Sequence, residues 1–326
     1  MNERKPVLEL ENVSVAYDSP AGRVQAVNHV SMTIYENMIY GLIGESGSGK
    51  STLAHAIIRL LKNNAVLTSG SIKVMGQDIY QLDKKALRTF RWERMSMVFQ
   101  SAMNALNPVL TIEEQILDVF KTHKPNMSRA EALKKVRELM GIVSIDPSYL
   151  RSYPHELSGG MRQRVVIAIA ISLEPELVIM DEPTTALDVV VQRSILDKIK
   201  EIQREKKFAV LFISHDFSLV AELASKIAIM YAGRFIEVTD NQSLTLSEKH
   251  HPYTEGLMRA IPRLTAEDVT IEGIPGHPPN LIDLPSGCPY HPRCPYAFDR
   301  CRSVRPDEHH LEGRSVQCHL YDTVAK

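Results

Sequence analysis

A run of glycine and serine residues that ends in lysine and serine could do chemistry on phosphates. It follows Ile39 to Ile43, a short apolar segment typical of a buried strand, and precedes a stretch with apolar residues at helical spacing. Such a turn directs backbone N–H groups at phosphate oxygens, and the helix N-terminus adds a favourable dipole. The pattern predicts a P-loop with Lys50 at the β/γ-phosphates of ATP and Ser51 on Mg²⁺. Its members are Gly44, Glu45, Ser46, Gly47, Ser48, Gly49, Lys50, Ser51 and Thr52.

Two adjacent carboxylates supply the second half of this chemistry. The apolar segment Leu177 to Met180 reads as a strand and delivers Asp181 at its carboxyl end, where open α/β sheets place ligands. We expect Asp181 to hold Mg²⁺ through water. Glu182 is the predicted general base that polarises the attacking water. An Asp-Glu pair at a strand end is common in proteins. The catalytic interpretation is favoured here because the same chain also contains a P-loop.

The elements around these residues alternate between strand and helix. Further strands are expected at 7–17, 95–99 and 209–213, and helices at 51–61, after a capping box at Ser128 to Glu131 with a stop at Gly141, and at Ile195 to Ile202. This order predicts an α/β fold with a mostly parallel sheet covered on both faces. We expect residues 1–250 to form one domain with a helical insertion at about 101–165. Residues 251–326 are expected to form an irregular extension, because the segment from Gly273 to Pro306 is rich in proline.

Composition narrows the range of partners. The chain has 326 residues, 44% of them hydrophobic, and 38 basic against 39 acidic side chains, which gives no electrostatic reason to expect nucleic acid. The first residues lack the apolar core of a secretory signal, and the longest apolar run, Val165 to Leu173, is too short to span a bilayer. We therefore expect a chain that starts in the cytoplasm and serves a membrane only through a partner.

One segment of the predicted helical insertion indicates which class of ATPase this chain resembles. Leu157 to Arg164, with the sequence LSGGMRQR, resembles the signature sequence of ATP-binding cassette (ABC) ATPases. Ser158, Gly159 and Gly160 precede an apolar helical run, so they form a second helix N-terminus suited to phosphate but without a lysine. Such a site needs the P-loop of another subunit.

The remaining elements of the ABC pattern occur in order. By resemblance, Gln100 belongs to the Q-loop, Ala186 to Asp188 form the D-loop, and His215 is the switch histidine. Gln100 is expected to reach Mg²⁺ and the attacking water, and His215 to donate a hydrogen bond to the γ-phosphate. Tyr17 stands where this family places an aromatic ring on adenine. The resemblance implies the P-loop NTPase fold of ABC ATPases with an N-terminal antiparallel β subdomain.

Four longer segments are similar to the oligopeptide/dipeptide permease ATPases, and the likeness covers nearly the whole chain. They are residues 98–108, 152–164, 251–257 and 284–294. Ser101-Ala102 departs from the Asp-Pro that members commonly have, which bears on the contact with a transmembrane partner and not on catalysis. The resemblance implies an ATPase that powers peptide import at the cytoplasmic face of the membrane. Its implied partners are a second and distinct ATPase chain, two transmembrane permease subunits and, indirectly, a solute-binding protein.

Two kinds of alternative stay open for this function. One is an importer for nickel chelates or another small solute. The other is a soluble ABC ATPase that acts on nucleic acid or ribosomes, for which the chain lacks a second ATPase half, a long coiled coil and a basic stripe. A regulator without catalysis is disfavoured, because Lys50, Asp181, Glu182 and His215 are all present.

All four cysteines, Cys288, Cys294, Cys301 and Cys318, lie in the last 39 residues. Clustering of this kind in a cytosolic protein favours a metal centre over disulfides. The spacing lacks the C-x₂-C pairs of zinc ribbons, and four thiolates on a proline-rich scaffold suit a structural 4Fe–4S cluster, which some ATPases resembling this chain carry there. Zinc with help from His291 or His319, and unligated thiols, are the alternatives.

Overall fold

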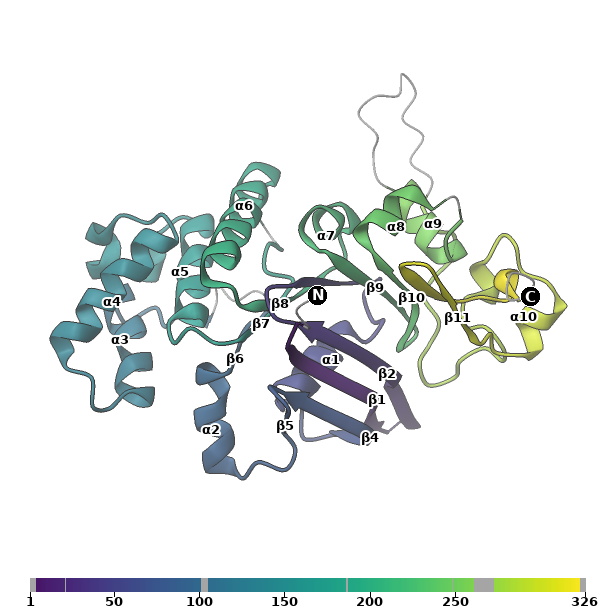
Figure 1. The fold of residues 1–326 in the computed structure, drawn as a ribbon, viewed down its shortest axis with the longest axis horizontal. Coiled ribbons are helices and arrows are strands. Elements are labelled where there is room, and N and C mark those ends of the chain that lie inside the picture. The colour runs from purple at the N-terminus through teal and green to yellow at the C-terminus, as the bar shows by residue number, and fades with distance from the viewer. Residues whose placement is uncertain are drawn as a thin grey trace, which may run out of the picture. The chain divides into compact units, whose positions relative to one another are not determined.

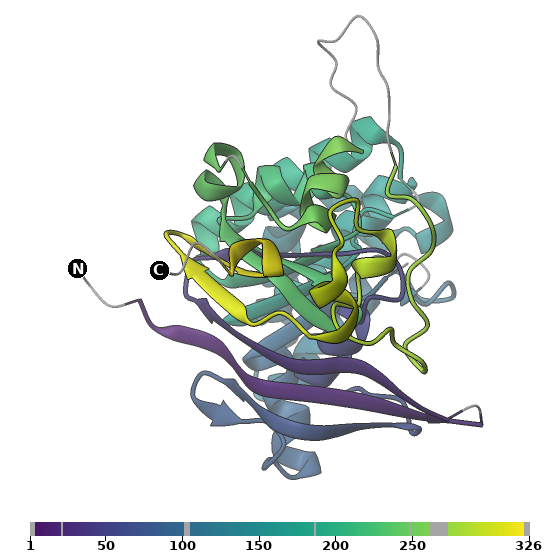
Figure 2. The same cartoon turned by 90° about the vertical axis from the view of Figure 1, so that its right-hand side faces the viewer.

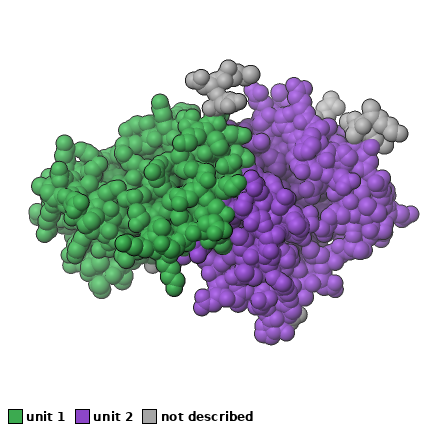
Figure 3. Space-filling view, turned by 60° about the horizontal axis from the view of Figure 1, so that its bottom comes forward, with its two compact units in different colours: residues 1–9, 33–38, 73–212 green, residues 10–32, 39–72, 213–326 purple. Residues whose placement is uncertain are grey.

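The computed structural model describes residues 4–20, 22–100, 105–185, 187–247, 249–260 and 273–322. Three residues named in the sequence-based predictions lie outside these ranges: Ser101, Ala102 and Ala186. The described chain divides into two compact units, coloured separately in Figure 3. Unit 1 comprises residues 1–9, 33–38 and 73–212, and unit 2 comprises residues 10–32, 39–72 and 213–326. The chain crosses from one unit to the other inside four of its strands. The two units therefore do not coincide with the two predicted domains, 1–250 and 251–326. That division into domains stays a prediction.

Unit 1 contains parallel strands and most of the helical insertion. Strands β6 (Met95–Val98) and β7 (Leu177–Asp181) pair in parallel, and β8 (Ala209–Ser214) is the next strand in the sheet order. The helices are α2 (Lys84–Glu93), α3 (Ile112–His123), α4 (Arg129–Ile142), α5 (Gly159–Ile171) and α6 (Val189–Lys206). Figure 1 shows α3, α4 and α5 grouped together in teal. Every residue of β7 and β8 is buried, which explains their uninterrupted apolar sequences.

Unit 2 contains the strand–loop–helix that carries the P-loop. Strand β3 (Ile39–Ile43) pairs in parallel with β9 (Lys226–Tyr231), and β9 pairs antiparallel with β10 (Arg234–Asp240). The helices are α1 (Lys50–Ile57), α7 (Phe217–Leu223), α8 (Asn241–Leu246), α9 (Pro252–Arg259) and α10 (Asp299–Ser303). The hairpin of β11 (Glu308–Leu311) and β12 (Arg314–Gln317) extends the sheet at β10, where Figure 2 shows its yellow strands beside the green ones.

A separate four-stranded sheet has the order β2-β1-β4-β5. Its strands are β1 (Pro6–Ser19), β2 (Gly22–Tyr35), β4 (Ala65–Val74) and β5 (Gln77–Asp78), with β4 and β5 antiparallel. The α/β class with parallel core strands and this N-terminal sheet is confirmed.

The predicted helix boundaries need small corrections. Ser128 and Glu131 form the expected capping box, in which the Glu131 backbone N–H donates to the Ser128 hydroxyl and the Glu131 carboxylate accepts from the Ser128 N–H. The predicted stop at Gly141 is one residue early, because its backbone is not left-handed and α4 continues to Ile142. As expected, the proline-rich region from 273 to 306 contains no long helix in its described residues.

Candidate nucleotide site

The P-loop of unit 2 is fixed by close backbone contacts. Gly49 precedes α1 with a left-handed φ of 108°, and a Cβ at this position would lie 2.2 Å from the Ala26 carbonyl oxygen. A Cβ on Gly44 would lie 2.3 Å from the Met230 carbonyl oxygen in β9. Only glycine fits at either position, since real Cβ atoms essentially never approach so closely. The glycines of the sequence pattern therefore let the loop lie against β2 and β9.

Lys50 lies across the loop that it follows. Its ammonium group donates to the carbonyl oxygens of Gly44 at 2.7 Å and Glu45 at 2.9 Å, and the residue is only 5% exposed. The backbone N–H groups at the start of α1 have no acidic side chain in the first turn beside them. A buried cation beside the N-terminus of a helix makes a phosphate site.

The other predicted residues of unit 2 lie near the ends of its strands. Tyr17, in β1, is half-buried, and its hydroxyl lies 3.1 Å from the hydroxyl of Thr52 in the P-loop helix. This places the Tyr17 hydroxyl beside the P-loop helix, and stacking of its ring on adenine stays a prediction. His215 is exposed directly after β8. Asp216 then caps α7 by accepting from the backbone N–H of Ser218 at 2.9 Å.

Unit 1 brings two of the predicted catalytic residues into contact. The side-chain amide of Gln100, two residues after β6, donates to the Glu182 carboxylate at 3.0 Å. The Thr185 hydroxyl donates to the same carboxylate oxygen at 3.1 Å. Glu182 follows the buried Asp181 and has a φ of 48°, which non-glycine residues rarely adopt. This strained backbone turns the glutamate out of the line of β7 at the end of the strand.

The predicted signature residues form the N-terminus of α5. The Ser158 hydroxyl caps the helix by accepting from the Met161 N–H at 3.3 Å, and no acidic side chain occupies the first turn. Gly159 and Gly160 are the first helical residues and are partly exposed. Asp188 caps α6 in the same way, accepting from the Val191 N–H at 3.0 Å. The helix terminus expected from the sequence is present, without any lysine in its first turn.

The four cysteines of unit 2 line one small cavity, together with His251, His291 and His319. All four are free thiols, and burial raises the pKa of Cys294 to about 11 and that of Cys318 to about 12. Within the described residues, however, no group of three or more His, Cys, Asp or Glu side chains is arranged to hold a metal ion. The prediction that the cysteines come together agrees with this cavity, while the predicted 4Fe–4S site finds no support in the arrangement of their side chains.

Two residues that the sequence analysis gave no role bind the P-loop directly. The Arg293 guanidinium forms two hydrogen bonds to the Glu45 carboxylate, at 2.7 and 2.9 Å, and the Tyr253 hydroxyl accepts from the Glu45 N–H at 2.9 Å. Both belong to segments that resembled peptide-permease ATPases, at 251–257 and 284–294. That likeness marked the segments without indicating what their side chains contact.

A P-loop after a buried strand, a second helix N-terminus with an SGG sequence, and a glutamate directly after a buried aspartate define an ATPase of the ABC class. Residues 27–185 match the ABC transporter family, and residues 236–301 match the C-terminal region of oligopeptide/dipeptide transporters. The chain belongs to the ABC transporter family, in its oligopeptide/dipeptide branch.

Individual relatives support this placement along almost the full length. The chain is 42% identical to the oligopeptide transport ATP-binding protein OppD of Escherichia coli, over 96% of this chain and 92% of that protein. It is 37% identical to the dipeptide transport ATP-binding protein DppD of Caldanaerobacter subterraneus, over 97% of each chain.

Solved structures of ABC cassettes share the fold. One is the dimeric cassette MJ0796 in a post-hydrolysis state bound to ADP and phosphate, with a TM-score of 0.64 and 28% identity over 72% of this chain and 98% of that one. Another is cbiO1 of Clostridium perfringens, with a TM-score of 0.65 and 25% identity over 75% of this chain and 92% of that one. The cassettes cover less of this chain than the full-length relatives do.

Proposed function

We propose that this chain is the ATP-binding and ATP-hydrolysing subunit that powers import of peptides by an ABC transporter. The observation that carries the proposal is the likeness, over 96% of the chain, to proteins named for oligopeptide transport, combined with an intact P-loop and catalytic glutamate. Membership of the family makes the chain an ATPase coupled to transport. The described residues form no helix with the length and apolar character of a membrane span. The proposal includes transmembrane permease partners because the relatives are ATP-binding proteins named for peptide transport. We place the subunit at the cytoplasmic face of the membrane.

The mechanism needs two ATPase chains. In it, the P-loop of one chain and the α5 N-terminus of the other hold the same ATP, since α5 offers N–H donors but no lysine. Lys50 would pair with the β/γ-phosphates of ATP. Ser51 and Asp181 would supply oxygens for Mg²⁺, and Gln100 would reach the metal and the attacking water. Closure of the two chains moves the permease subunits, and hydrolysis permits reopening. The second chain is a distinct sister ATPase in this proposal.

Glu182 is the general base in this mechanism, and His215 donates to the γ-phosphate as charge develops. The Gln100 amide and the Thr185 hydroxyl hold the Glu182 carboxylate in place. Such a carboxylate accepts a proton from water as the water attacks the γ-phosphate. Glutamine at this position keeps the shape and loses that capacity.

The test is Glu182→Gln. We expect ATP affinity close to that of the unchanged protein, hydrolysis reduced by at least about a hundredfold, and accumulation of the closed dimer with ATP. Glu201→Gln, at an exposed glutamate that pairs with Lys198 on α6, is the control and should hydrolyse ATP normally. Unchanged hydrolysis in Glu182→Gln would show that the base lies elsewhere.

A groove in unit 1 is the proposed contact with the permease subunits. It has a volume of about 400 Å³, and its lining includes Phe99 next to Gln100 and residues of α3 and α5. Val109, beside this lining, is 75% exposed. An apolar groove next to the catalytic Gln100 would connect a moving partner to the hydrolysis site. Recovery of the chain with membranes and permease subunits supports this role, and recovery in the soluble fraction with bound nucleic acid would contradict it.

We further propose that the cysteine cavity holds a 4Fe–4S cluster with a structural role. The proposal rests on the shared cavity and the chemistry of the donors, and not on the arrangement of the side chains, which forms no metal-holding group among the described residues. Thiolates are the ligands that such clusters use. Cys288, Cys294, Cys301 and Cys318 would be the ligands. Anaerobically purified chain should then be brown, with about four iron and four sulfide per chain. Colourless protein with stoichiometric zinc would contradict the proposal.

A further inference from the structure

The side chain of Arg293 crosses from the cysteine-rich tail to the P-loop. Its two terminal nitrogens bind the two carboxylate oxygens of Glu45 at 2.7 and 2.9 Å, and its Nε donates to the Pro275 carbonyl oxygen at 2.8 Å. The residue is only 7% exposed. A bidentate arginine–carboxylate pair with this little solvent contact fixes both position and orientation.

Aromatic rings hold the arginine on its other sides. The guanidinium carbon lies 5.9 Å from the centre of the Tyr231 ring and 6.0 Å from that of Tyr290. Tyr231, at the end of β9, also packs against Tyr253, with ring centres 4.7 Å apart. Tyr290 packs edge-on against Tyr253 at 5.4 Å. Rings from β9 and the tail therefore lie against Arg293 and restrict its alternative rotamers, and the Tyr253 ring of α9 packs against both of them.

Each polar group of Glu45 has a partner. Its carboxylate binds Arg293, its N–H donates to the Tyr253 hydroxyl at 2.9 Å, and its carbonyl oxygen accepts from Lys50 at 2.9 Å. Two of these three partners come from the segment after residue 250. The position of the carbonyl that receives the P-loop lysine thus depends on residues about 200 or more positions away in the chain.

The charge of Glu45 gives the contact a second consequence. A carboxylate within a phosphate-binding loop repels a nucleotide that carries several negative charges. The guanidinium, on a side chain that is 5% exposed, neutralises this carboxylate, whose side chain is 27% exposed and therefore only partly screened by solvent. Removing Arg293 alone would leave the carboxylate unpaired beside the phosphates.

We propose that Arg293 is a positioning residue of the nucleotide site, which holds the first turn of the P-loop through Glu45 and neutralises its carboxylate. Tyr253 assists by fixing the Glu45 backbone. The tail thereby sets the affinity of the site for ATP. This inference rests on the proposed P-loop role of residues 44–52 and adds a function for the tail that does not depend on a metal.

The main test compares ATP binding and hydrolysis in the full chain with Arg293→Gln. We expect ATP affinity to fall by about tenfold to a hundredfold, and KM for ATP to rise by more than kcat falls. Arg300→Gln is the matched control, because Arg300 lies in the same tail and pairs with Asp322 at 2.9 Å, half-exposed. Its ATP affinity should equal that of the unchanged chain.

Two further variants separate positioning from a general loss of structure. Tyr253→Phe keeps the ring packing and removes one acceptor, so ATP affinity should fall by about two- to tenfold. The double variant Glu45→Gln, Arg293→Gln removes both charges and should recover most of the affinity lost in Arg293→Gln. If Arg293→Gln does not fold, the test is the loss of affinity in Tyr253→Phe together with an ATP affinity of the double variant close to that of the unchanged chain.

The outcomes distinguish this inference from the proposed function. Lys50→Ala should lose ATP binding, and normal binding by that variant would overturn the P-loop assignment itself. If Lys50→Ala loses binding while Arg293→Gln only unfolds at lower temperature with unchanged ATP affinity, Arg293 is structural and our inference is wrong. If the double variant loses as much ATP affinity as Arg293→Gln alone, the neutralising role of Arg293 is wrong.

Discussion

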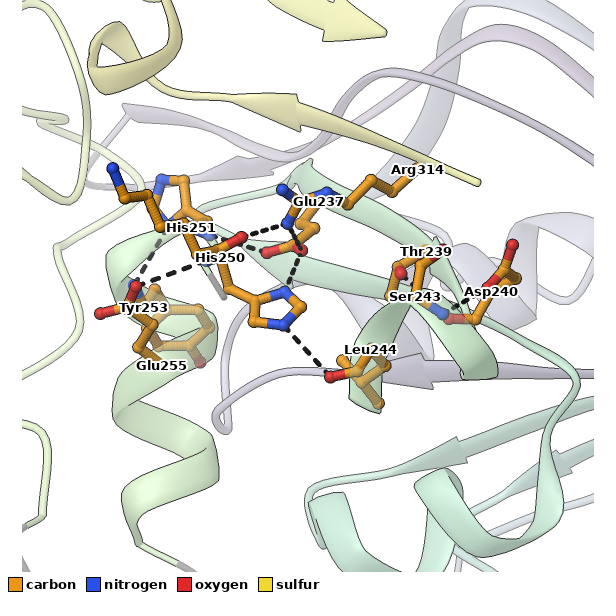
Figure 4. A network of polar contacts seen from close by, with 11 residues as sticks. Glu237, Thr239, Asp240, Ser243, Leu244, His250, His251, Tyr253, Glu255 and Arg314 are labelled. Atoms are coloured by element: carbon orange, nitrogen blue, oxygen red, sulfur yellow. Dashed lines mark hydrogen bonds and ion pairs between the residues drawn. The ribbon is translucent and has the colours of Figure 1, made fainter. Parts of the chain in front are cut away.

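Glu237 in β10 carries a buried carboxylate that the sequence analysis did not single out. Its side chain accepts from the backbone N–H of His251 at 2.9 Å and lies 2.7 Å from the His250 Nδ1 atom. Arg314 of β12 lies 3.7 Å from the same carboxylate, and Figure 4 shows Glu237 among these residues. Burial, the largest single cause, raises the pKa of Glu237, but the hydrogen bonds to its carboxylate and the charge of His250 together outweigh burial, so the pKa is lowered from its ordinary value.

This lowered pKa predicts a loss of stability in acid. The folded state binds the proton less readily than the unfolded state, so the contribution of Glu237 is complete well above pH 4.5 and is lost as the pH falls through the lowered value. Glu237→Gln should lower the free energy of unfolding at pH 7 by roughly 3 kcal/mol and flatten its decline between pH 5 and 3. Urea unfolding at several pH values measures both effects.

The control for this prediction lies two strands away in the same sheet. Glu308 in β11 is exposed, and Glu308→Gln should retain the acid dependence of the unchanged chain. An equally steep decline in Glu237→Gln would mean that other groups cause the acid sensitivity.

At the scale of elements, the contact between α5 and α6 positions the signature residues. A Cβ on Gly160 would lie 2.6 Å from the Val191 side chain, so α5 can approach α6 only with glycine there. Gly141, near the end of α4, has no atom within 4 Å of such a Cβ and is not left-handed. The two helical glycines thus differ in their surroundings, although both stand near helix ends.

Alanine at these two positions should act in opposite directions. Gly141→Ala should raise the free energy of unfolding by about 0.5 kcal/mol, because alanine loses less backbone entropy in a helix. Gly160→Ala should lower it by about 1 kcal/mol or more and reduce ATPase activity, because α5 must shift away from Val191. Thermal unfolding and ATPase assays of both variants measure this, and a stabilised, fully active Gly160→Ala would contradict the role of this contact.

At the scale of the whole molecule, the segment after residue 250 completes unit 2. Strand β12 pairs with β10 along residues 237–239, Arg314 and the His251 N–H approach Glu237, and Arg293 and Tyr253 bind Glu45. A chain without this segment would have an unpaired sheet edge at β10 and a buried carboxylate with fewer partners.

We therefore expect a fragment of residues 1–250 to aggregate. Size-exclusion chromatography and circular dichroism, with the full chain treated in parallel, measure this outcome. A monomeric fragment with cooperative unfolding and the ATP affinity of the full chain would refute both this expectation and the role of Arg293.

The sequence by itself determined the α/β class, the P-loop, the signature helix and most element positions. These features depend on short-range patterns: the glycines and lysine of 44–52, the apolar runs of β3, β7 and β8, and the capping box at Ser128. Local backbone geometry and the period of burial determine which residue types stand at neighbouring positions, so these features can be predicted from short segments of sequence.

Only the tertiary structure decided which distant side chains meet. Arg293 and Glu45 are 248 positions apart, and no local period relates a proline-rich tail to a glycine-rich loop. The Gln100 amide and the Glu182 carboxylate are 82 positions apart, and only the fold brings them into contact, although a role had been predicted for each. Such pairs depend on how strands and loops come together in space, which alternating patterns along the chain do not encode.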